Sequence, residues 1–300
     1  MCLWHACPMT FNSNYQRGSG YAKTGSGGRR GVPIAAGGGI GGLVLIVLFI
    51  ALGGNPADLI EQSPSGTEPD SSYSLEHCNE DNAANKYDDC RVEAAGVSVN
   101  GVWKTLLPEQ AGLDYTEPGL TLFRDATQTG CGYASSATGP FYCPADQTAY
   151  FDTTFFEQLN ALGGNDAPFT QMYVTAHEFG HHVQQIEGTL GLSNYNDPGE
   201  HSAAVAIEMQ ADCYAGIWAH YADKGDNALL EPLTEDDVLA AIETAQAIGD
   251  DNIQRRSGGD VNPDTWTHGS SEQRKTAFMS GYRTGKMSAC DTLNRGVYKG

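Results

Sequence analysis

Basic residues are scarce in this chain, which has 17 lysines and arginines against 37 aspartates and glutamates, for a formal net charge of −20 at pH 7. Four of the basic residues precede residue 58, where no acid occurs, so only 13 remain to balance all 37 acids. A protein that binds phosphate backbones needs clustered cations. The composition therefore argues against nucleic acid as a partner and favours a soluble, extracytoplasmic body.

Charge is also missing from the whole stretch Gly31–Ala57, which contains the apolar run Leu43–Leu52. These 27 uncharged residues are enough to cross a bilayer, which takes about 20. Arg29 and Arg30 flank the N-terminal side, so the positive-inside rule places the N-terminus in the cytoplasm. We expect a single-pass transmembrane helix at residues 34–54. A cleaved signal peptide is the alternative, because the apolar core is short.

The regions around this segment lack the apolar periodicity of folded elements. Residues 1–33 form a Gly/Ser-rich tail, expected to be cytoplasmic and disordered, and residues 55–74 form a linker rich in Pro and Ser. Met9 is an alternative start to Met1. We therefore expect the folded domain to span residues 75–300, anchored to the cell membrane and lying outside it.

The sequence has eight cysteines but no C-x-x-C pair, which argues against a zinc site made of cysteines. Six of the cysteines follow the hydrophobic segment, and an even number suits disulfides in an exported domain. Two pairs share a spacing of twelve residues, which suggests two local bridges and leaves a third pair, although 15 pairings are possible in principle. The preferred pairs are Cys78 with Cys90, Cys131 with Cys143, and Cys213 with Cys290.

The chain does contain an H-E-x-x-H motif, at His177, Glu178 and His181. On a helix, residues four positions apart leave the same face, so both imidazoles can reach one zinc ion. Glu178 then lies beside the metal, where it can act as a base rather than as a ligand. Gly188 suits the end of this helix, and Gly180 inside it suggests the close approach of another backbone. The alternative is a pair of half-exposed helical histidines.

The third ligand decides the class of zinc site. A metzincin would carry glycine at position 184 and histidine at 187, whereas this chain has Gln184 and Glu187. The Ala-rich segment 202–218 is prone to form a helix and offers Glu208, with Asp212 one turn further on the same face. This second helix is therefore the better source of a ligand.

An acid on an apolar helix needs a partner, because a buried carboxylate without a cation is costly. We expect Glu208 to bind the zinc ion and Asp212 to accept the free N–H of a ligating histidine. Three alternatives remain. The two acids could lie on the surface of an amphipathic helix, or the third ligand could be Glu187 or His201.

The motif HEFGH followed by Glu208-x-x-x-Asp212 resembles the gluzincin scheme of thermolysin-like peptidases. The whole chain more closely resembles a bacterial family of neutral zinc metallopeptidases, most of them membrane-anchored. The stretches that carry this resemblance are residues 139–146, 176–184, 208–213 and 267–274. The resemblance implies a zinc peptidase that acts on a peptide or protein, but it does not define the substrate.

The stretch 267–274 holds a further candidate. Ser270-x-x-Gln273 is a capping box, which places His268 immediately before the start of a helix. A histidine there could reach the metal cleft and stabilise the oxyanion of a tetrahedral intermediate. The family resemblance favours a functional role for His268 and Arg274. The alternatives are a surface histidine and an arginine paired with a nearby acid.

The sequence as a whole predicts an α+β domain of the zincin type. It is mostly helical, with a small antiparallel sheet from the short strand-like runs in residues 119–153. The predicted activity is peptide hydrolysis with zinc held by His177, His181 and Glu208 and with Glu178 as general base. Two alternatives stay open: a catalytically idle envelope protein that binds partners, and a metal-dependent amidase that acts on cell-wall peptide.

Overall fold

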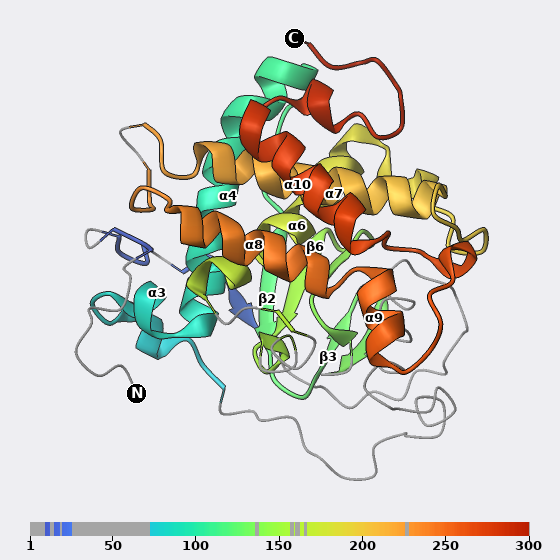
Figure 1. Ribbon diagram of the computed structural model, residues 1–300. Coiled ribbons are helices and arrows are strands. Elements are labelled where there is room, and N and C mark those ends of the chain that lie inside the picture. Colours follow the sequence, from blue (N-terminus) through green and yellow to red (C-terminus); the bar gives the residue numbers. More distant parts are fainter. Residues whose placement is uncertain are drawn as a thin grey trace.

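The computed structural model (Figure 1) describes most of the chain beyond residue 72 and part of its N-terminal region. The expected transmembrane helix at residues 34–54 lies outside the described residues, as does nearly all of the expected linker. Among the described helices, none combines the length and the apolar character needed to cross a bilayer. The described residues are 10–12, 15–18, 20–25, 73–135, 138–156, 159, 163–164, 167–225 and 228–299.

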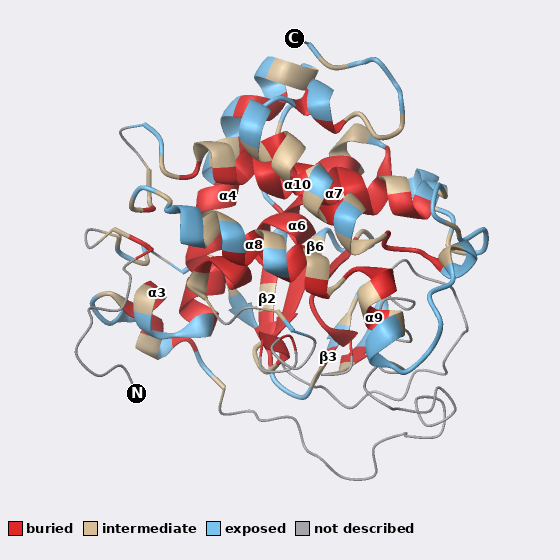
Figure 2. Ribbon diagram, in the orientation of Figure 1, coloured by how far each residue is buried: buried red, intermediate tan, exposed pale blue. Residues whose placement is uncertain are grey.

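The fold is mostly helical with a small sheet, which confirms the α+β class. Two helices form its centre: α6 carries the H-E-x-x-H motif and is buried almost throughout, and α7 carries Glu208 and packs against it (Figures 1 and 2). Helix α10 also packs along α7. The helices are α3 (Ala83–Lys86), α4 (Asp88–Ala111), α6 (Pro168–Glu187), α7 (Ala203–Tyr221), α8 (Glu235–Ala247), α9 (Asp250–Arg256) and α10 (Ser271–Thr284).

The main sheet is mixed, so the prediction of a small antiparallel sheet is right for two strand pairs in residues 119–153 and wrong for a third. Its strand order is β1-β2-β6-β5, in which β1, β2 and β6 are parallel and β5 is antiparallel to β6. An antiparallel β3–β4 hairpin and then β5 lie between β2 and β6 in the chain, and their reversals return β6 to the direction of β2. The strands are β1 (Lys23–Thr24), β2 (Gly119–Phe123), β3 (Ala126–Thr129), β4 (Gly132–Ser135), β5 (Phe141–Cys143) and β6 (Thr148–Asp152).

The three expected disulfides are confirmed. Two are local, and the third ties α7 to a 3₁₀ turn near the C-terminus. Disulfides persist in oxidising compartments, so their presence indicates an extracytoplasmic environment for the domain. The bridges are Cys78–Cys90, Cys131–Cys143 and Cys213–Cys290.

Part of the expected N-terminal tail belongs to the folded body. Phe11 is 1% exposed and lies in the core, and Lys23–Thr24 form β1 at the edge of the sheet, seen in blue in Figure 1. At the described residues 10–12, 15–18 and 20–25 the structure therefore differs from a disordered tail, because they include an apolar anchor in the core and a strand that pairs with the edge of the sheet.

Glycines allow the central helices to pack at backbone distance. A Cβ atom at Gly180 would lie 3.1 Å from the carbonyl oxygen of Ala211, so the close approach predicted at this position is present. At the next crossing, a Cβ atom at Gly281 of α10 would overlap the carbonyl oxygen of Cys213 on α7. No side-chain rotation relieves such an overlap, because the position of the Cβ atom is fixed by the backbone of α10 and the carbonyl oxygen belongs to the backbone of α7.

Gly281→Ala is therefore expected to destabilise the protein by about 3 kcal/mol, the upper part of the range for overpacking. Thermal unfolding of the purified protein measures this loss. The matched control is Gly101→Ala in α4, where no atom lies within 4 Å of the added methyl group. Since alanine favours a helix over glycine by up to about 1 kcal/mol, this control should be neutral or stabilising. Equal melting temperatures for both variants would contradict the packing described here.

Candidate metal centre and active site

The two histidines of the motif lie one turn apart on α6 and face the same side. Their ring centroids are 4.8 Å apart with nearly perpendicular planes, and His177 and His181 are only 7% and 8% exposed. Residue spacing on the helix produces this arrangement directly. Their burial excludes the alternative of half-exposed helical histidines.

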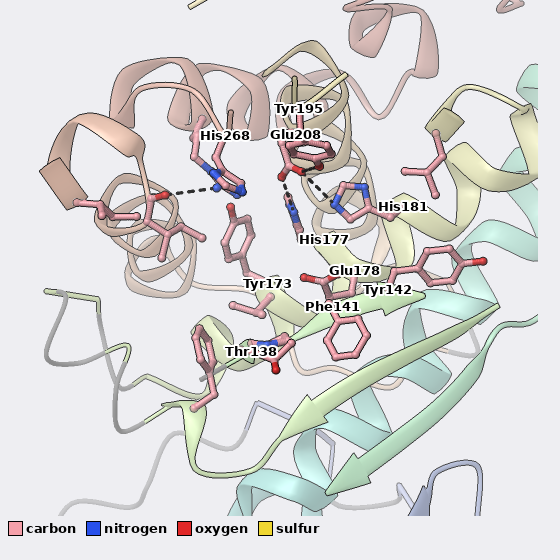
Figure 3. Close-up of a pocket in the computed structure, with 18 residues that line it drawn as sticks. Thr138, Phe141, Tyr142, Tyr173, His177, Glu178, His181, Tyr195, Glu208 and His268 are labelled. Carbon is pink, nitrogen blue, oxygen red and sulfur yellow. Dashed lines mark hydrogen bonds and ion pairs between the residues drawn. The ribbon is translucent and has the colours of Figure 1, made fainter. Parts of the chain in front are cut away.

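Helix α7 brings Glu208 to the same point. Its Oε2 lies 3.3 Å from Nε2 of His177, and its Oε1 lies 3.7 Å from Nε2 of His181. Figure 3 shows both imidazoles turned toward this carboxylate. One donor atom from each of the three buried residues lies within 4.8 Å of the others, so they can hold one metal ion. Two imidazole nitrogens and one carboxylate oxygen fit zinc and leave its fourth position open.

The rival ligands lie elsewhere. His201 is exposed in the turn before α7. Glu187, at the end of α6, accepts a hydrogen bond of 2.7 Å from the hydroxyl of Tyr214. A second cluster of possible ligands, around His77 and Asp89, contains two cysteines whose sulfur atoms are already joined in a disulfide. Among the described residues, the site of His177, His181 and Glu208 is therefore the one suited to zinc.

Asp212 holds His177 in place. Its Oδ1 lies 2.8 Å from Nδ1 of His177, which leaves Nε2 of that ring directed at Glu208. Burial opposes the charged form of Asp212, but Arg274 and His177 outweigh it and lower the pKa of the carboxyl group below its ordinary value. Arg274 from α10 donates to both carboxylate oxygens, at 2.9 and 3.0 Å. Arg274 is thus paired with a nearby acid, Asp212, which was the alternative to a direct functional role for this arginine.

Gln184 holds the imidazole of His181 through Nδ1, as Asp212 holds that of His177, and this role was not predicted from the sequence. Its Oε1 lies 2.8 Å from Nδ1 of His181, and its amide nitrogen donates to the carbonyl of Ile207 and to Gln210 on α7. The amide is thereby oriented with its oxygen toward the imidazole. The available signal was the spacing of three residues after His181, which puts Gln184 on the neighbouring position of the same helix face.

Glu178 lies in the cleft beside the metal ligands, on the side of β5 (Figure 3). It is 7% exposed, and this burial raises the pKa of its carboxyl group, although His177 and His181 oppose the rise. The carboxylate is therefore a stronger proton acceptor than one in water. The cleft around it is largely apolar, with Phe141, Val174 and Ile248 among its walls.

His268 reaches the same cleft, from the loop that precedes α10 (Figure 3). Asp250 at the start of α9 fixes it: one carboxylate oxygen accepts the backbone N–H groups of residues 267–269, and the other lies 3.2 Å from Nδ1 of His268. Burial opposes protonation of His268, but Asp250 raises the pKa of the imidazole. Nε2 of His268 is buried with no protein partner.

Asp250 and Tyr195 were not among the residues predicted from the sequence. Helix α9 has only seven residues and was not predicted, so nothing marked its first residue as a partner of His268. Tyr195 lies in the loop before α7, and its hydroxyl donates to Oε1 of Glu208 at 3.2 Å. His182 instead has a structural position: its ring lies between the carbonyl of Thr116 and the hydroxyl of Tyr142.

Comparison with known proteins gives matches over nearly the whole chain. The family model described as "Putative neutral zinc metallopeptidase" matches residues 2–293. An uncharacterised protein of Mycobacterium tuberculosis is 45% identical over 251 residues, which cover 81% of this chain and 84% of the relative. The uncharacterised protein YpfJ of Escherichia coli is 36% identical over 269 residues, 86% of this chain and 88% of the relative. No solved structure shows a significant match.

Proposed function

Because the chain belongs to the neutral zinc metallopeptidase family, we propose that it hydrolyses peptide bonds outside the cytoplasmic membrane, with Glu178 as general base. The observation that carries this proposal is the buried cluster of His177, His181 and Glu208, which opens into a cleft with Glu178 beside it. A protein that only binds partners has no use for a base at this position.

The side chains of the cleft have different roles in the proposed hydrolysis. When held by the two histidines and Glu208, zinc supplies Lewis acidity, which polarises a carbonyl oxygen and lowers the pKa of water. Glu178 takes the proton from the attacking water and then delivers it to the nitrogen of the leaving amine. Asp212 and Gln184 keep the Nδ1 atoms of the histidines occupied, so that the Nε2 atoms stay available as ligands.

His268, in the loop before α10, supports the same reaction. A peptide carbonyl gains negative charge as water adds to it, and a fixed N–H donor stabilises that charge in a site with little water. Nε2 of His268 is such a donor, because Asp250 holds the other ring nitrogen and favours the protonated imidazole. The buried Nε2 without a protein partner fits a group that bonds the substrate.

His268→Ala is expected to lower kcat by about 10²–10³-fold, the usual cost of one oxyanion donor, and to leave zinc content unchanged. Steady-state hydrolysis and metal analysis of the same preparation measure the two quantities. His201→Ala is the matched control, since His201 is exposed and outside the cleft. Loss of zinc in His268→Ala, or unchanged kcat, would contradict a role at the developing oxyanion.

The proposal as a whole is tested on the purified protein with a broad peptide library. Cleavage should stop after zinc is removed by a chelator and return when zinc alone is added back. Fragments of cell-wall peptide form a separate arm of the assay. Cleavage of those fragments alone would make the protein an amidase, and cleavage that survives full metal removal would exclude the zinc mechanism.

A further inference from the structure

A buried carboxylate on α4 accepts hydrogen bonds from the N-terminal segment, a name used for the described residues 10–12, 15–18 and 20–25. Glu93 is 1% exposed. One of its oxygens accepts a hydrogen bond from the guanidinium Nε of Arg17. The other accepts hydrogen bonds from the backbone N–H groups of Tyr21 and Ala22, the bond from Ala22 being 2.9 Å long. Because a buried carboxylate without partners is strongly unfavourable, the domain is incomplete unless this segment is in place.

The start of the segment is fixed just as firmly. Asn85 accepts the backbone N–H groups of Thr10 and Phe11 at 3.1 and 2.9 Å and donates to the carbonyl of Phe11. Phe11 forms an antiparallel bridge with Leu230, and Asn12 donates to the carbonyl of Leu229. The ring of Phe11 is therefore held in the core by backbone bonds on both sides.

The end of the segment reaches the helix that carries the metal ligands. Strand β1 pairs with β2 through Lys23 and Thr24 and so covers the edge of the sheet. The ring of Tyr21 lies 6.4 Å, centroid to centroid, from that of Phe179, inside the H-E-x-x-H motif. Gly96 of α4 leaves room for this contact, since a Cβ atom there would lie 3.0 Å from Phe179 and 3.2 Å from Tyr21.

From these three sets of contacts we propose that the N-terminal segment is a structural part of the zinc domain and lies on the same side of the membrane. A single membrane crossing between residues 25 and 73 would separate Arg17 from Glu93 and β1 from β2. The proposal therefore replaces the expected cytoplasmic N-terminus. It does not depend on peptidase activity.

The topology is tested with single cysteines in the full chain after Cys2→Ser and Cys7→Ser. Gln16→Cys marks the N-terminal segment and Glu272→Cys marks the domain, both at exposed positions. Intact spheroplasts are treated with a membrane-impermeant maleimide, before and after lysis. We expect both cysteines to be labelled before lysis. If Glu272→Cys reacts in intact spheroplasts while Gln16→Cys reacts only after lysis, the proposal is overturned.

Thermal unfolding of the full chain gives an independent test. Phe11→Ala should lower the melting temperature by more than about 5 °C, because a large buried side chain is removed. Arg17→Ala should lower the melting temperature as well, because it leaves the carboxylate of Glu93 without its charged partner. In a Glu93→Gln background the same Arg17→Ala change should lower the melting temperature less, since no buried charge is then left unpaired. Gln16→Ala, at an exposed position, is the control. Unchanged melting temperatures for both Phe11→Ala and Arg17→Ala would show that the segment is a detached tail.

Discussion

Glu178→Gln is expected to fold and to retain zinc but to lose peptidase activity by about 10²–10⁴-fold, the usual contribution of general acid–base catalysis. Glutamine matches glutamate in size and can donate and accept hydrogen bonds, yet it cannot take a proton from water at neutral pH. Burial raises the pKa of Glu178, which makes the native carboxylate a better acceptor than one in solution. The loss should fall on kcat, because the amide still fits the cleft.

The matched control is Glu187→Gln on the same helix. Glu187 is partly buried, but its partner is Tyr214 and it does not line the cleft. This variant should keep full activity. If Glu178→Gln cleaves as fast as the native protein, Glu178 is not the base. If the native protein cleaves nothing in a broad library and both forms bind the same partners, the function is binding, with zinc as a structural ion.

Residue spacing made the metal centre predictable from the sequence. His177 and His181 meet because four residues make about one helical turn, and Glu208 and Asp212 share a face for the same reason. A carboxylate on an otherwise apolar helix also indicated a charged or metal partner before any contact was known. Each of these signals is local, and each involves strong, directional chemistry.

The features that the sequence did not reveal depend on contacts between distant segments. Arg17 and Glu93 are 76 positions apart, and Asp250 and His268 are 18 apart in a short helix and a loop that have no periodic pattern. The parallel pairing of β2 with β6 has a similar origin, because it is set by the number of chain reversals between them. Strand propensity reports that a segment is extended, but it carries no information about direction.

The second large effect that we expect is the loss of bound zinc when Glu208 is replaced. Glu208→Ala should reduce bound zinc from about one ion per chain to a small fraction of that, because it removes one of three protein ligands. The two remaining imidazoles are held by Asp212 and Gln184, so the cluster cannot rearrange easily to recruit another donor. Metal analysis after dialysis against a weak chelator measures the loss.

His201→Ala is the control for the same experiment, since His201 is the nearest rival by sequence but is exposed in the turn before α7. Asp212→Asn should give an intermediate result: a 10–100-fold loss of zinc affinity is usual when the partner of a metal-binding histidine is altered. His201→Ala should therefore retain the most zinc, Asp212→Asn less, and Glu208→Ala the least. The reverse order for His201→Ala and Glu208→Ala would move the third ligand to His201. That result would also remove the resemblance to the gluzincin scheme, in which the third ligand is Glu208.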